Sequence, residues 1–159
     1  MKKQLTIALT LILVLTACGN ESTISTLSYP VPDQEMHGSE EGLSLTLEED
    51  IYLGSPFVIK TVVQNATSSD YQLGEFFHIE VNKDGQYFII TYSDAVFLKN
   101  PSFKDYGNVL SANSKAHQTF SVDALGVTLI PGEYRLVKTF LSLGKPLYEL
   151  SVAVPFTVE

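Results

Sequence analysis

The most specific structural signal in this chain lies in residues 129–142, LIPGEYRLVKTFLS. A Pro131-Gly132 turn precedes a β-forming run, and Tyr134 stands two residues after the glycine, where the strand begins. This spacing resembles a tyrosine corner, in which a buried tyrosine hydroxyl bonds to backbone a few residues upstream. We therefore expect Tyr134 to be buried, with its hydroxyl bonded to the backbone near Val127 to Leu129.

Two hairpins follow from the pattern of apolar residues. LYELSVAVPFTV, residues 147–158, alternates apolar and mainly polar side chains, and so pairs with residues 129–142 through Gly144 and Lys145. In FFHIEVNKDGQYFIITY, residues 76–92, Asp84-Gly85 indicates a two-residue turn. That turn pairs Val81 with Phe88, Ile79 with Ile90 and Phe77 with Tyr92. A three-residue loop with a bulge at Gly85 would instead pair Val81 with Tyr87 and Ile79 with Ile89, a less apolar set, so the pattern favours the first register.

The rest of the folded region also shows strand periodicity. LSLTLE (43–48), FVIKTVVQN (57–65) and AHQTFSV (116–122) are typical of strands, and no stretch has a convincing helical period. Residues 93–114 are expected to form short strands or irregular loop. About seven short strands separated by turns predict an all-β fold, an antiparallel β-sandwich, and the tyrosine corner narrows it to an immunoglobulin-like one.

Four segments carry a resemblance to a known family. VVQNAT, FHIEVNKDGQYFII, LIPGEYRLVKTF and VPFTV together resemble the bacterial Ig-like domain found in many small lipoproteins of Gram-positive bacteria. The resemblance covers residues 42–159 and implies an Ig-like sandwich. The chain has one cysteine and no tryptophan, so it departs from antibody domains, which have a core disulfide and tryptophan. These motifs concern the fold and say little about function.

The first seventeen residues have the layout of an export signal. Lys2 and Lys3 precede an apolar run over 5–15, which is too short to span a bilayer core of roughly 30 Å. The sequence LTAC at 15–18 resembles the lipobox of bacterial lipoprotein precursors. This resemblance implies that 1–17 is a lipoprotein signal peptide and that Cys18, after cleavage, carries a diacylglycerol. The alternative is an ordinary signal peptide cleaved nearby, with Cys18 incidental.

The segment after the cysteine predicts a tether. Residues 19–42 are rich in Ser, Thr, Pro, Gly and acidic residues and lack periodicity, so we expect 18–41 to form a flexible lipidated tether below a domain at 42–159. Met36 and His37 fall inside it and are interpreted as solvated residues. The chain carries a net charge of −8. Without 1–17, eight basic residues remain against eighteen acidic ones, a net charge of −10, which excludes nucleic acid as a partner.

The sequence contains no recognisable catalytic or metal-binding motif. His37, His78 and His117 are scattered, and the single cysteine has no partner, so no metal site is predicted. No serine lies in a G-x-S-x-G elbow, and no glycine-rich loop suits a phosphate. The acidic runs at 40–41 and 48–50 indicate a solvated rim rather than a calcium site. We therefore predict no catalytic residues, no cofactor and no enzymatic activity.

Two classes of function remain. The first is a lipid-anchored, non-catalytic module on the extracytoplasmic face of the cell membrane that binds a protein or a cell-wall polymer. The alternative is a proteinase inhibitor or accessory subunit that presents a loop, for which 93–114 is the candidate. The outer face of the 76–92 hairpin offers a possible interaction patch of Tyr87, Ile89 and His78. Either a neighbouring loop such as 93–114 covers this patch, or it is open to a partner.

Overall fold

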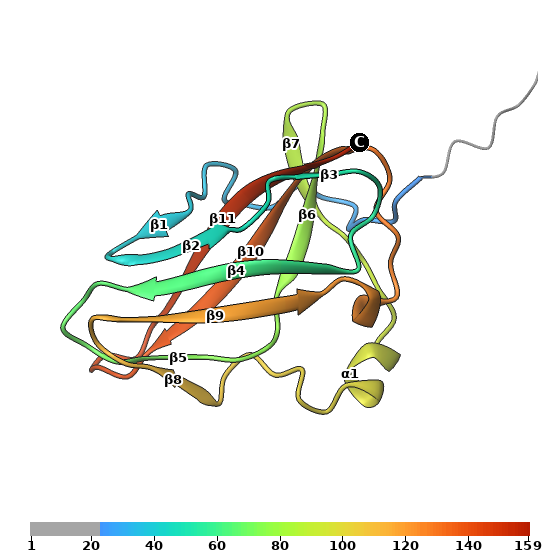
Figure 1. Cartoon of the computed structure of the whole chain (residues 1–159). Coiled ribbons are helices and arrows are strands. Elements are labelled where there is room, and N and C mark those ends of the chain that lie inside the picture. The colour runs from blue at the N-terminus through green and yellow to red at the C-terminus, as the bar shows by residue number, and fades with distance from the viewer. Residues whose placement is uncertain (1–22) are drawn as a thin grey trace, which may run out of the picture.

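The computed structural model describes residues 23–159, which form two β-sheets packed face to face (Figure 1). The predicted signal peptide and Cys18 lie outside the described residues. The first sheet has the strand order β1-β2-β4-β9. Its strands are β1 (Ser39–Glu40), β2 (Leu43–Leu47), β4 (Val58–Asn65) and β9 (Ser114–Ser121).

The second sheet has the order β3-β11-β10-β5-β8, and β6 pairs with both β10 and β7. Its strands are β3 (Ile51–Tyr52), β5 (Tyr71–Leu73), β6 (His78–Lys83), β7 (Gln86–Ile89), β8 (Asn108–Leu110), β10 (Gly132–Ser142) and β11 (Glu149–Val158). The predicted antiparallel sandwich is confirmed, apart from one parallel pair between β3 and β11. Eleven strands are present in residues 23–159 instead of about seven, because four of them are only two or three residues long.

The core lies between the two sheets and is filled by alternate residues of their longest strands. Phe77 before β6 and Phe120 of β9 meet there with ring centroids 4.7 Å apart. Alternation puts every second side chain on the inner face of a strand. For this reason Tyr134, Leu136 and Phe140 of β10 are all fully buried.

The favoured register of the β6–β7 hairpin is confirmed. Val81 is paired with Phe88, and the amide of Ile90 donates to the carbonyl of Ile79 over 3.0 Å. The turn residues Asp84 and Gly85 have φ angles of 54° and 82°, the positive values that a two-residue hairpin turn needs.

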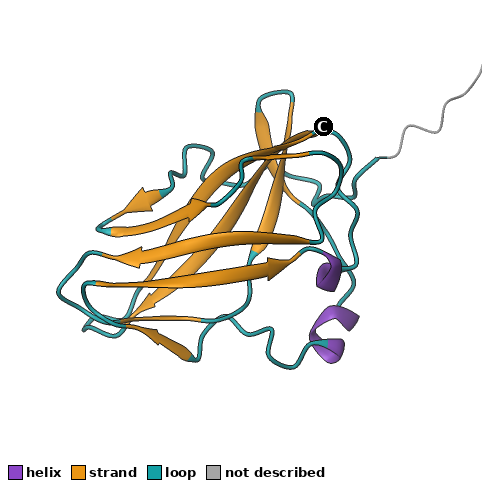
Figure 2. Ribbon diagram, viewed as in Figure 1, coloured by secondary structure: helices purple, strands orange, loops and turns teal. Residues whose placement is uncertain are grey.

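Residues 93–114 form a short helix as well as a strand. α1 (Ala95–Lys99) precedes β8, and Val96 and Phe103 are buried in the core. The sequence pattern did not predict this helix, because five residues are too few to show a helical period. A 3-10 helix, η1 (Asp123–Leu125), lies at the same end of the sandwich (Figure 2). Within residues 23–159 no helix has the length and apolarity needed to cross a membrane.

Residues 24–37, which we call the strap, run along the outer edge of β7. The amide of Leu27 donates to Ile89, and the amide of Thr91 donates to Ser25, each over 2.9 Å. The sequence predicts a flexible tether over 18–41, and the structure differs from this prediction over the strap. The reason is that β7 has β6 on one side only, so its other edge offers free backbone groups that the strap pairs.

Candidate functional site

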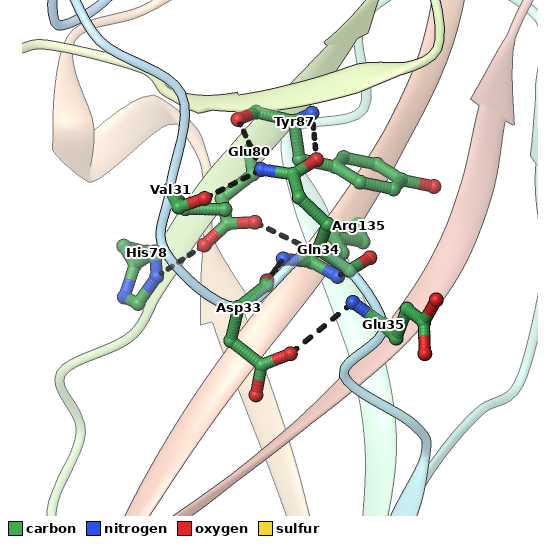
Figure 3. Close-up of polar contacts among 8 residues, drawn as sticks. All are labelled: Val31, Asp33, Gln34, Glu35, His78, Glu80, Tyr87 and Arg135. Carbon is green, nitrogen blue, oxygen red and sulfur yellow. Dashed lines mark hydrogen bonds and ion pairs between the residues drawn. The ribbon is translucent and has the colours of Figure 1, made fainter.

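The strap crosses the outer face of β6, β7 and β10 and covers a cluster of polar side chains (Figure 3). Arg135 of β10 lies directly opposite Glu80 of β6 in the antiparallel register. Alternation along both strands turns these two side chains away from the core. They are nevertheless buried, with exposed fractions of 3% for Arg135 and 1% for Glu80, because the strap lies over them.

Glu80 is the charge partner at the centre of the cluster. Arg135 Nε donates to Glu80 Oε2 over 2.5 Å, and His78 Nε2 lies 3.0 Å from Glu80 Oε1. A buried charge is tolerated when an opposite charge and hydrogen bonds replace its lost hydration. Both carboxylate oxygens of Glu80 are therefore occupied inside the protein.

The guanidinium group of Arg135 also binds the strap. Nη1 donates to the carbonyl of Gln34 over 3.1 Å, and Nη2 donates to the carbonyl of Asp33 over 2.6 Å. The guanidinium carbon lies 4.1 Å from the ring centroid of Tyr87, a cation–π contact. Arginine suits this role because its planar fork contacts several groups at once.

The side chain of Gln34 extends the pairing between strap and β7. Its Oε1 accepts from the amide of Tyr87 over 2.8 Å, and its Nε2 donates to the carbonyls of Val31 and Tyr87 over 2.6 and 3.3 Å. The amide of Val31 donates to the same Tyr87 carbonyl over 3.0 Å. A side-chain amide thus takes the place of a backbone unit at the edge of the sheet.

This cluster fixes the strap, and its charged groups bond to one another. The structure brings His78, Tyr87 and Ile89 to one face, as the register requires, but Tyr87 and Ile89 are half-buried. The covering segment is the strap, in place of the 93–114 loop that was expected from the sequence. The only sign of this contact in the strap's own sequence is the short alternation of Leu27, Tyr29 and Val31 with Ser28, Pro30 and Pro32, which is interrupted by two prolines. The strap covers this face in part, and the acidic groove described below offers a more open surface.

A second buried cation lies on the inner face of β10. Lys138 is fully buried, and its Nζ donates to the carbonyls of Gly74 and Phe76, the latter over 2.6 Å. Burial lowers the pKa of Lys138 to about 8, although the nearby carboxylates of Asp105 and Glu75 act in the opposite direction. The lysine ties the β5–β6 connection to the central strand.

The tyrosine corner is present. Tyr134 is fully buried, and its hydroxyl donates to the carbonyl of Ile130 over 2.6 Å. The acceptor is one residue beyond the predicted range of 127–129. Burial raises the pKa of Tyr134, and the hydrogen bond to Ile130 partly opposes that change. The ring stacks on Phe156 with centroids 5.4 Å apart.

An acidic groove of about 370 Å³ lies beside the strap and joins segments that are distant in sequence. It lies where the strap, β1 and the start of β11 meet. Three ion pairs are present in the described part of the chain, and they involve Glu80 and Glu48 but no carboxylate of this groove. Of the two acidic runs that the sequence indicated as a solvated rim, 40–41 lines this groove and 48–50 does not. The five carboxylates that line the groove are those of Asp33, Glu35, Glu40, Glu41 and Glu149.

The described residues contain no group of three or more His, Cys, Asp or Glu side chains placed to hold a metal ion. His37 lines the acidic groove, His78 bonds to Glu80, and His117 lies on β9, 3.9 Å from Glu48. The three histidines therefore serve separate parts of the surface.

Comparison with known families matches residues 39–157 to the bacterial Ig-like domain. The chain belongs to this family. The match spans the sandwich from β1 into β11, and it confirms the Ig-like fold predicted for 42–159. Curated proteins gave no match to the chain.

Membership of the bacterial Ig-like family indicates a non-catalytic interaction module. The Ig-like domain of this chain does not present 93–114 as a free loop, because Val96 and Phe103 anchor that segment in the core. The aromatic rings of Phe76 and Phe103, with centroids 5.3 Å apart, hold it further. The candidate loop for proteinase inhibition is thus held to the core through Val96 and Phe103, although most of its other residues are exposed.

Proposed function

We propose that this protein is a lipid-anchored, extracytoplasmic binding module that holds a cationic partner segment in its acidic groove. The observation that carries the proposal is the convergence of five carboxylates from the strap, the β1 region and β11 on one groove. The partner class that fits is a protein segment or polymer with clustered positive charges.

The electrostatics of the groove support this partner class. The whole chain has ten basic and eighteen acidic residues, so the groove lies in an overall negative field. A concave surface lined by one sign of charge concentrates that field and attracts ligands of the opposite sign. Tyr148, whose hydroxyl donates to Glu41 over 3.2 Å, adds an aromatic side chain to the lining.

The groove is tested with a fluorescent deca-lysine peptide and the full chain. Asp33→Asn, Glu35→Gln and Glu40→Gln together should weaken peptide binding strongly, and the wild-type affinity should fall as salt is added. The matched control removes three exposed charges elsewhere on the described surface, through Glu75→Gln, Asp84→Asn and Asp123→Asn. Equal loss in both triple variants would contradict a local site and indicate only the overall charge.

The lipid anchor is tested separately at Cys18. The LTAC motif at 15–18 supports acylation of this thiol. Cys18→Ala should move the protein from the membrane fraction to the medium or leave it as uncleaved precursor. A fully processed, membrane-bound Cys18→Ala protein would overturn the anchor.

A further inference from the structure

Residues 33–37 of the strap, which we call the wall, contribute to two grooves. Three of them, Glu35, Met36 and His37, line the acidic groove and also a second groove of about 350 Å³ that reaches Arg135. None of residues 33–37 is fully buried. Side chains that bury little apolar surface add little to the stability of a segment. The position of the wall therefore depends on hydrogen bonds to its backbone.

These hydrogen bonds hold the wall at both of its ends. At the start, Arg135 donates to the carbonyls of Asp33 and Gln34 over 2.6 and 3.1 Å. Within residues 23–159 these two carbonyls accept from no other donor. At the end, the amide of Ala153 in β11 donates to the carbonyl of His37 over 2.8 Å. Arg135 is thus the side chain that fixes the backbone where the wall begins.

This part of the wall carries two of the five carboxylates of the acidic groove. Asp33 and Glu35 stand on either side of Gln34 in the chain, and the amide of Glu35 donates to Oδ1 of Asp33 over 3.1 Å. The backbone over 33–35 therefore orients the Asp33 carboxylate. Figure 3 shows the guanidinium of Arg135 against this backbone, where the buried Glu80 keeps it in place.

The wall needs such a contact because the groove has one sign of charge. Like charges repel, so the carboxylates of the wall are pushed away from the others that line the groove. Those others come from the β1 region and from β11, and they are the carboxylates of Glu40, Glu41 and Glu149. Two charge-assisted hydrogen bonds from a guanidinium are strong enough to oppose that repulsion.

We propose that Arg135 is a positioning residue for the cationic partner, because it holds Asp33 and Glu35 at the acidic groove. The inference rests on the proposed function of that groove. Arg135 does not line the groove and acts on it through the backbone of the strap. Its positive charge alone would disfavour a cation nearby. A loss of binding when Arg135 is removed is therefore the opposite of what charge alone predicts.

The experiment removes this contact while the net charge stays constant. The clamp variant combines Glu80→Leu with Arg135→Met, which deletes one charge of each sign and leaves neither charge buried alone. The control variant combines Glu48→Gln with Lys60→Gln, two exposed residues near β2 and on β4 of the other sheet. Each full chain is titrated with the fluorescent deca-lysine peptide. The clamp variant should bind at least about fivefold more weakly than wild type, and the control variant should bind as wild type does.

Amide hydrogen exchange, followed by NMR, shows whether the wall itself has been released. The amide of Ala153 donates to His37 in the wall and should exchange faster in the clamp variant than in wild type. The amide of Leu27 donates to Ile89 in an earlier part of the strap and should exchange at the wild-type rate. General destabilisation of the domain would accelerate both amides, so this pair separates positioning from a merely structural role.

The outcomes separate this inference from the proposed function. If the clamp variant binds deca-lysine as wild type does, the bonds of Gln34 and Ala153 hold the wall alone and the inference is overturned. Weaker binding with unchanged exchange at Ala153 also overturns it, as does an equal loss of affinity in the control variant. If wild type does not bind deca-lysine at all, the proposed function fails and this inference fails with it.

Discussion

Strand β10 buries two cations three residues apart, one on each face of the sheet. Arg135 on the outer face is 3% exposed and Lys138 on the inner face is 0% exposed. Each donates to two backbone carbonyls of a neighbouring segment, Arg135 to the strap and Lys138 to the β5–β6 connection. Only Arg135 has a carboxylate partner, because Glu80 stands opposite it in the register.

The difference shows that one strand can compensate for the lost hydration of a buried cation in two ways. Beside Arg135, the negative charge of Glu80 offsets the hydration that the guanidinium loses on burial. Around Lys138, lost hydration is compensated by carbonyl dipoles and by the ring of Phe120, which lies 5.5 Å from Nζ. Burial lowers the pKa of Lys138 to about 8. Arg135 is therefore held in an ion pair with Glu80, whereas Lys138 has no carboxylate partner and can lose its charge.

The largest effect is expected from breaking the outer pair. Glu80→Ala leaves the guanidinium of Arg135 buried without a counter-charge, which should lower the free energy of unfolding by about 3–5 kcal/mol. Urea denaturation followed by circular dichroism measures this change. The control variant combines Glu80→Leu with Arg135→Met and should be more stable than Glu80→Ala, since no unpaired charge remains. A loss below about 1 kcal/mol for Glu80→Ala would mean that the pair contributes no more to the free energy of unfolding than an exposed ion pair does.

A smaller effect is expected from titrating Lys138. The pKa of Lys138 is about 8 in the folded protein against an ordinary value of 10.5, so between these values the unfolded chain binds more protons. Stability therefore rises with pH in this window and levels off below it. From about pH 7.5 to about pH 9.5, wild type should gain about 2 kcal/mol relative to Lys138→Met.

Denaturant midpoints of wild type and Lys138→Met across this range measure that gain. The comparison cancels the titration of groups that the two proteins share. Two pH profiles that run parallel would show that the carbonyls of Gly74 and Phe76 stabilise the ammonium as fully as water does.

The smallest effect is expected from a neutral group on the same strand. Tyr134→Phe keeps the ring that stacks on Phe156 and removes only the hydrogen bond to the carbonyl of Ile130. The free energy of unfolding should fall by about 0.5–1.5 kcal/mol, since one neutral hydrogen bond is lost and no charge is stranded. An unchanged urea midpoint and slope would mean that the corner adds nothing to stability.

Local patterns predicted much of the fold. The register of the β6–β7 hairpin followed from Asp84-Gly85 and the alternation around it, because a tight turn and a half-buried face leave few choices. The tyrosine corner followed from the spacing in LIPGEYRL, with the acceptor displaced by one residue to Ile130. The candidate site could not be predicted from the sequence, because Asp33, Glu41 and Glu149 come together only through the arrangement of the strap and the sheets.

By itself the sequence determined the period of the strands, the turn at Asp84-Gly85 and the corner at Tyr134, because each depends on neighbours along the chain. Only the tertiary structure decided that the strap closes the edge of β7 and that Glu80 and Arg135 become buried. Glutamate and arginine on the outer face of a sheet are typical of solvated positions. Their burial came from the strap, which is about fifty residues from Glu80 and about one hundred from Arg135 in sequence. The strap pairs with backbone groups that every strand edge carries whatever its side chains.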